Sequence, residues 1–233
     1  MDVQDGFILG IYNYCDRWCG CCRFTSRCRV FADGAEHEAS SSPELKALSE
    51  APLHASDLRP PGRWLAEILS EMNLEEPVEL VEPPPMPSDF LRVCALSSAY
   101  CDHAWATLES HERTEPETND DPCSVVQWFA PLIASKTRRA LSGLNEFDGC
   151  RDFPPDHEGS AKVALLGIDR SMLAWAAARD AGRVSADDAS RFIGELHRLC
   201  TELEELIPRA RGFIRPAFDE PDEVRKLEAV DWS

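Results

Sequence analysis

Five cysteines near the start of the chain lie close enough together to bind a metal. They are Cys15, Cys19, Cys21, Cys22 and Cys28. Four of them follow the spacing C-x3-C-x2-C-x5-C, so short loops bring four thiolates together at a small entropic cost. Four thiolates are the ligands of tetrahedral zinc and of a [4Fe–4S] cluster. We therefore predict one centre held by Cys15, Cys19, Cys22 and Cys28, with Cys21 as a spare thiol or a replacement for Cys22.

The residues between these cysteines suit such a centre. Residues 12–31 contain four arginines and a single acidic residue, Asp16. Either kind of four-thiolate centre carries a net charge near −2, and neighbouring cations offset that charge and lower thiol pKa values. Three aromatic residues of the segment, Trp18, Phe24 and Phe31, can shield the sulfurs from water. A set of simply reduced thiols is the alternative, but it does not explain this density of cysteine.

Charge and cysteine usage limit the setting of the protein. Its net charge of −18 opposes binding to nucleic acid and to anionic lipid, and it favours a basic protein partner. The acidic N-terminus lacks the pattern of a secretory signal, and no apolar run is long enough to span a membrane. Ten cysteines in such a chain indicate metal binding in a reducing compartment rather than disulfides. We expect a cytoplasmic protein, and the sequence identifies no small-molecule ligand.

Two local resemblances bear on the type of centre. The half Cys19-x2-Cys22-x5-Cys28 resembles the iron–sulfur staple of the RecB-like nucleases, over ten residues. That resemblance implies a [4Fe–4S] cluster, whereas structural zinc usually uses two separate cysteine pairs. No PD-(D/E)xK nuclease core accompanies it, so no nuclease activity is implied. We favour the [4Fe–4S] cluster and keep zinc as the alternative.

The other half, Cys15-x3-Cys19-x2-Cys22, resembles the motif of the radical-SAM enzymes. Cys28 would fill the iron site that this chemistry leaves open, and the rest of the chain has no barrel of alternating strands. We therefore do not expect radical-SAM activity.

A wider resemblance covers three blocks spread along the chain. The blocks are IYNYCDRWC…FTSRCRVF, GSAKVALLGIDRS and ARGFIRPAFDE. They resemble a set of bacterial helical proteins that have an N-terminal cysteine cluster and an unknown function. The resemblance implies that the cluster and the helices belong to one unit, but it implies no activity. Cys21 and Arg23 depart from that pattern.

Four helical patterns can position this segment. Apolar residues recur at spacings of three and four over 88–113, 123–144, 160–181 and 185–206. We predict a mostly α fold in which an N-terminal cysteine-rich metal module packs on a four-helix bundle. The expected parts are a metal segment over 1–31, a linker with two short helices and a proline-rich acidic connector over 32–87, the bundle over 88–207, and an irregular tail over 208–233 that packs on the bundle.

We expect a metal-binding protein with a redox, sensing or scaffold role. The alternative is an enzyme with a polar pocket in the bundle around Asp169 and His103. Asp169 stands in an otherwise apolar helical stretch, where a buried carboxylate needs a partner. A structural ion pair with Arg211 or Arg215 is the favoured interpretation of Asp169, and a catalytic or metal-binding carboxylate is the second. The tail arginines are expected to meet acidic partners, with a groove for a phosphate ligand as the alternative.

Overall fold

The computed structural model describes residues 3–40, 84–109, 121–145 and 156–219. The chain divides into two compact units. One comprises residues 1–32 and 84–233, and it contains both the cysteine segment and the helical bundle. The other comprises residues 33–83, of which 33–40 are described. The two short helices predicted after residue 41, and most of the proline-rich connector, lie outside the described residues.

A two-stranded hairpin opens the described chain. Strand β1 (Val3–Gln4) pairs antiparallel with β2 (Phe7–Ile8), with Val3 opposite Ile8. Asp5 and Gly6 form the turn, and both have positive φ, 51° and 85°. Two-residue hairpin turns of type I′ require positive φ at both positions, and Asp-Gly is a favoured pair for them.

Three short 3-10 helices and one α-helix follow the hairpin. They are η1 (Ile11–Asn13), η2 (Cys19–Cys21), η3 (Thr25–Arg27) and α1 (Arg29–Ser40). Helix α1 corrects the prediction of a linker that begins at residue 32. Alanine and glutamate are good helix formers even where apolar residues show no period, and a single Gly34 costs only about 1 kcal/mol.

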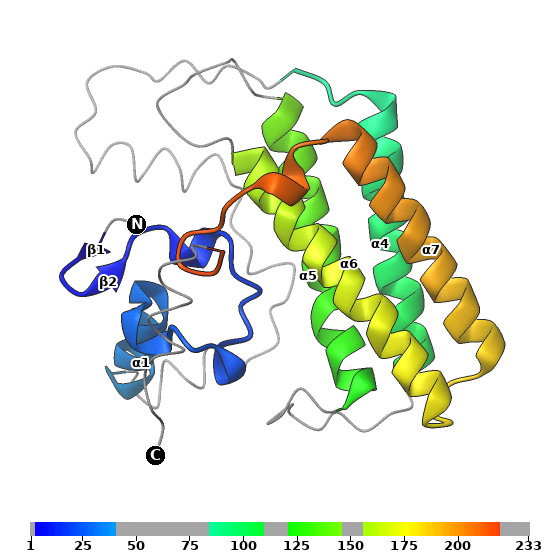
Figure 1. Cartoon of the computed structure of the whole chain (residues 1–233), viewed down its shortest axis with the longest axis horizontal. Coiled ribbons are helices and arrows are strands. Elements are labelled where there is room, and N and C mark those ends of the chain that lie inside the picture. The colour runs from blue at the N-terminus through cyan, green and yellow to red at the C-terminus, as the bar shows by residue number, and fades with distance from the viewer. Residues whose placement is uncertain (1–2, 41–83, 110–120, 146–155, 220–233) are drawn as a thin grey trace, which may run out of the picture. The chain divides into compact units, whose positions relative to one another are not determined.

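Four long helices pack side by side, as Figure 1 shows. They are α4 (Ser88–Leu108), α5 (Pro122–Asn145), α6 (Asp156–Asp180) and α7 (Ala186–Leu206). Helix α5 contacts α4 and α6, and α7 contacts the same two helices, so the four close around one core. The predicted four-helix arrangement is confirmed.

The predicted boundaries of α7 are also confirmed. Ser185 is the N-cap residue, and its hydroxyl accepts a hydrogen bond of 3.0 Å from the backbone N–H of Asp188. Gly182, with φ of 68°, follows α6 in the left-handed conformation that ends many helices. Helix α7 stops at Leu206, two residues before Pro208.

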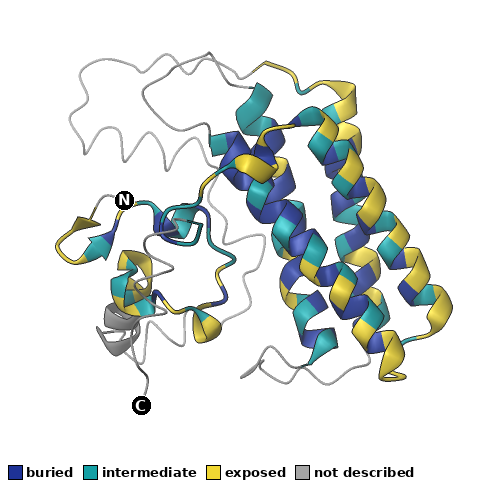
Figure 2. Cartoon of the chain, viewed as in Figure 1, coloured by how far each residue is buried: buried dark blue, intermediate teal, exposed yellow. Residues whose placement is uncertain are grey.

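Buried residues lie on the inner sides of the bundle helices, and the outer face of α7 is exposed (Figure 2). Trp175 is fully buried, stacks on Phe192 with ring centroids 4.2 Å apart, and donates a 3.1 Å hydrogen bond to the hydroxyl of Tyr100. Tyr100 of α4 therefore lies in the core with its hydroxyl hydrogen-bonded. Leu91 belongs to the apolar period over residues 88–113, which predicts a buried position, but its side chain is 53% exposed. The buried face of α4 is therefore rotated from the one that the period indicates.

The N-terminal residues and the tail form a second, smaller core. It contains Ile8, Ile11, Phe24 and Ala217, with Phe218 packed against them. The rings of Phe24 and Phe218 meet edge to face with centroids 5.0 Å apart. The tail was predicted to pack on the bundle, and its helix η5 (Ala210–Gly212) does contact α6. The residues that follow η5 complete the cysteine segment instead.

No helix in the described parts of the chain is both long and apolar enough to cross a membrane.

Candidate metal centre

Short helical turns place the four predicted ligands along one cavity. Cys19 begins η2 and Cys22 follows its last residue, and the backbone N–H of Cys22 donates to the carbonyl of Cys19 at 3.1 Å. Cys28 follows η3 in the same way, with a 3.2 Å bond from its N–H to Thr25. Cys15 lies two residues beyond η1. The cysteines therefore come from successive short turns of the chain.

The four thiols line one cavity of about 20 Å³. Cys21 does not line it. Apolar walls complete the cavity, formed by Ile11, Trp18, Phe24, Phe31 and Phe218, among others. Cys19 interacts electrostatically with Cys15, Cys22 and Cys28, which is further evidence that these four sulfurs converge. The structure therefore brings together all four predicted ligands and separates Cys21 from them.

Burial and backbone hydrogen bonds act in opposite directions on these thiols. Burial raises the pKa values of Cys15, Cys19 and Cys22. The backbone N–H of Phe24 donates to the sulfur of Cys22 at 3.4 Å, and that of Arg17 lowers the pKa of Cys15 similarly. In both cases the donor lies two residues after the cysteine. Such donors stabilise a thiolate, the form that binds metal.

The donor set fits a metal centre, and two observations bear on its kind. Within the described residues, no three Cys, His, Asp or Glu side chains lie close enough to hold a single ion. The cavity volume holds only about one water-sized group. That volume is small for a four-iron cube, so either kind of centre requires the cysteine side chains to adjust.

Three side chains of the bundle bind the cysteine segment. The buried ammonium of Lys136 donates to the carbonyl of Asn13 at 2.7 Å, and the indole N–H of Trp128 donates to the carbonyl of Asp16 at 3.0 Å. Arg170 of α6 forms a 2.7 Å ion pair with the carboxylate of Asp16. Sequence reasoning missed these three anchors. The sequence feature that could have revealed two of them is that Lys136 and Arg170 are charged residues within largely apolar helical patterns.

Tyr14 contacts α6 at a glycine, which has no side chain. Its ring packs against the backbone at Gly159 and lies 4.8 Å from the ring of Phe213. Burial, assisted by the charge of Asp156 and a hydrogen bond to it, raises the pKa of Tyr14 to about 12. Only glycine leaves room for this ring, because a Cβ atom at position 159 would overlap it.

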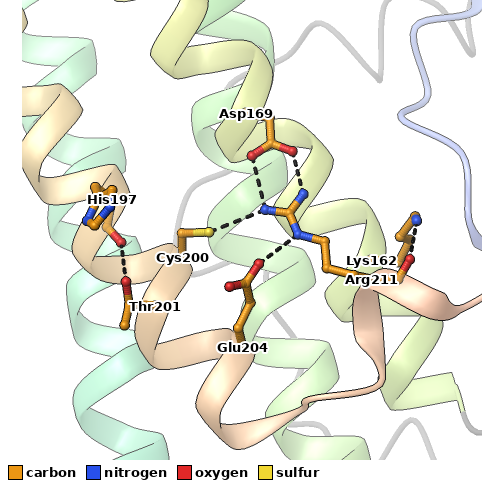
Figure 3. A network of polar contacts seen from close by, with 7 residues as sticks. All are labelled: Lys162, Asp169, His197, Cys200, Thr201, Glu204 and Arg211. Carbon is orange, nitrogen blue, oxygen red and sulfur yellow. Dashed lines mark hydrogen bonds and ion pairs between the residues drawn. The ribbon is translucent and has the colours of Figure 1, made fainter.

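Asp169 pairs with Arg211, one of the two arginines predicted for it, so this part of the prediction is confirmed. Both carboxylate oxygens accept from the guanidinium group, which also donates to Glu204 at 2.7 Å and to the sulfur of Cys200 at 3.3 Å (Figure 3). The predicted burial of the pair is wrong, because both side chains are 39% exposed. The pair joins the tail to α6 and α7 near the surface of the bundle.

Two further cavities border Trp18. One, of about 370 Å³, is mostly apolar and lies between α5 and α6. The other, of about 290 Å³, is lined by Asp16, Trp18, Cys21, Cys22, Arg23, Arg170, Arg215 and Phe218. Asp169 and His103 line none of the three cavities. His103 is largely exposed, with its Nδ1 atom 4.0 Å from a carboxylate oxygen of Glu195.

No protein-family model, curated protein or solved structure matches this chain.

Proposed function

We propose that the protein binds one metal centre through Cys15, Cys19, Cys22 and Cys28. The observation that carries the proposal is that these four thiols, out of five in the segment, line a single cavity with apolar walls. Backbone N–H groups directed at two of the sulfurs add support, because they stabilise thiolates.

A [4Fe–4S] cluster is the first candidate for this centre. The spacing of Cys19, Cys22 and Cys28 supports it. Zinc is the second candidate, and the small volume of the cavity favours it. When bound, a cluster supplies one-electron chemistry, whereas zinc supplies structural cross-linking.

A redox, sensing or scaffold role suits this centre better than catalysis. Cys19 is exposed, so the centre lies near the surface, where a partner can exchange electrons with it or respond to its state. The acidic chain suits a basic protein partner. The alternative of an enzyme around Asp169 and His103 gains no support, because Arg211 occupies both oxygens of Asp169.

Anaerobic purification, followed by iron, sulfide and zinc analysis and an absorbance spectrum, tests the proposal. A broad band in the violet-blue with iron and sulfide in equal amounts identifies the cluster, and one equivalent of zinc without colour identifies zinc. Cys22→Ala should abolish metal retention. Cys21→Ala is the matched control, because the two residues are adjacent but only Cys22 lines the cavity.

Equal loss of metal in both variants would show that the ligand set is wrong. A chain purified anaerobically without any metal, and unable to bind iron or zinc afterwards, would overturn the proposal altogether.

A further inference from the structure

The cavity of about 290 Å³ beside the cysteine ring gathers three guanidinium groups from distant parts of the chain. Arg23 comes from the cysteine segment, Arg170 from α6 and Arg215 from the tail. The cavity shares Asp16, Trp18, Cys22 and Phe218 with the cysteine cavity, so the two are adjacent. Its volume is near the lower end of the range for small-molecule sites.

Each of the three guanidinium groups rests on an aromatic ring. Arg23 lies 4.9 Å from the ring centroid of Phe24, Arg170 lies 5.3 Å from that of Phe129, and Arg215 lies 4.9 Å from that of Phe218. A group held over a ring loses little freedom when it binds a ligand. The rings therefore restrict the guanidinium groups before any ligand binds.

Carboxylates orient two of these arginines without using all their N–H groups. Arg170 donates from Nη1 to Asp16, and Arg215 donates from Nε and Nη2 to Asp219. A guanidinium group has five N–H donors, so several donors remain in each case. Three cations against two carboxylates leave a positive site in a chain of net charge −18.

We propose that this cavity binds a small oxyanion of the phosphate class, free or as a phosphate ester, on Arg23, Arg170 and Arg215. The planar fork of arginine matches the oxygens of phosphate. Of the tail arginines that the sequence suggested for a phosphate groove, only Arg215 lines the site. Arg209 and Arg211 instead pair with Glu158 and Asp169. The proposal stands on the arginines and does not require the metal centre.

Calorimetric titration of the full chain with inorganic phosphate and with phenyl phosphate at low ionic strength tests the proposal. Binding of inorganic phosphate indicates the free anion, and binding of phenyl phosphate alone indicates an ester. Arg23→Gln should weaken binding about tenfold or more, because a charge-assisted hydrogen bond contributes on that scale. Arg209→Gln is the control, because it removes the same charge from a residue outside the cavity and 83% exposed.

Alkylation of cysteine locates the bound anion. Cys21 is exposed and lines the cavity, so the anion should slow its reaction with iodoacetamide, as followed by peptide mass spectrometry. Cys101 on α4 lies outside the cavity and should react at an unchanged rate.

Three results would overturn the proposal. They are no binding of either probe, equal weakening by Arg23→Gln and Arg209→Gln, and no protection of Cys21. If Arg23→Gln lowers metal retention while neither anion binds, the arginines only balance the charge of the thiolate centre. Metal analysis and anion titration are separate measurements, so failure of one proposal is distinguishable from failure of the other.

Discussion

At the scale of single residues, Lys136 forms a buried contact between the bundle and the cysteine segment. Its side chain is almost fully buried, and burial lowers its pKa. The buried ammonium group has a hydrogen-bond acceptor there, the carbonyl of Asn13, which lies two residues before Cys15.

We expect Lys136→Met to lower the free energy of unfolding by about 1–3 kcal/mol, because the carbonyl of Asn13 loses its buried donor. Urea unfolding followed by circular dichroism measures this difference. Arg138→Met, at an exposed position of the same helix, should change the free energy by no more than about 0.5 kcal/mol. Equal effects of the two variants would contradict a specific role for Lys136.

Replacing Asp169 should cost less folding stability than its apolar sequence context suggests. A buried pair would cost about 3–5 kcal/mol to break. The pair with Arg211 is 39% exposed on both sides, so water screens it, and we expect Asp169→Asn to cost about 1 kcal/mol. The same urea measurement decides, and a loss above about 3 kcal/mol would mean that the pair behaves as a buried one.

At the scale of elements, Gly159 marks the contact between α6 and the cysteine segment. A Cβ atom here would overlap the ring of Tyr14 and lie 2.9 Å from the ring of Phe213. We expect Gly159→Ala to destabilise the protein by about 1–3 kcal/mol, as overpacking does, despite the higher helix propensity of alanine. Thermal unfolding of the variant measures the loss.

Gly194 supplies the matched comparison for Gly159. It lies within α7, and a Cβ atom there meets nothing within 4 Å. Gly194→Ala should therefore raise stability by up to about 1 kcal/mol. If both substitutions stabilise the chain, the docking of Tyr14 on α6 is not tight.

Glu202 of α7 links this helix to Arg92 of α4. Burial alone would raise the pKa of Glu202, but hydrogen bonds from Arg92 of α4 and Arg198 of α7 outweigh it and lower the pKa below its usual value. A carboxyl group with a lowered pKa stabilises the folded state above its unfolded-state pKa, and this contribution disappears as the pH falls through the folded-state pKa.

We expect Glu202→Gln to reduce stability at neutral pH, and the difference from the natural chain to shrink below about pH 4.3. Urea unfolding at a series of pH values between 7 and 3 follows this difference. Glu205→Gln, exposed on the same helix, should give a smaller difference across the series. A difference for Glu202→Gln that stays constant with pH would contradict the assignment.

At the scale of the whole molecule, the two ends of the described chain form one core. Ala217 and Phe218 of the tail pack against Ile8, Ile11 and Phe24. The smaller core therefore joins residues about two hundred positions apart, and it is distinct from the core of the bundle, to which the cysteine segment contributes Trp18.

We expect Phe218→Ala to speed amide hydrogen exchange in residues 3–32 and to leave helices α4 to α7 protected, because it removes part of the smaller core only. Exchange followed by mass spectrometry resolves the two regions. Ile214→Ala is the control, since Ile214 lies in the same tail and is 59% exposed. Uniformly faster exchange throughout the described helices would show that the two cores unfold together.

The sequence predicted the four helices well because their signals are local. Apolar residues at a helical period identify each helix, and the Ser185 cap and Gly182 identify boundaries from a few neighbouring residues. The closeness of the cysteine thiols was predictable for the same reason, since short loops leave them little distance to travel. The hairpin at Asp5-Gly6 carried a local signal too, which the sequence reasoning did not use.

By itself, the sequence determined that the four segments of the bundle are helical and that the cysteines of residues 15–28 are close enough to form a ligand set. Only the tertiary structure decided which face of α4 is buried, that Cys22 rather than Cys21 lines the cavity, and that Asp169 is half-exposed. It also brought Arg23, Arg170 and Arg215 to one cavity. The reason is physical: periodicity and spacing act between near neighbours, whereas burial and convergence depend on packing between residues far apart in the chain.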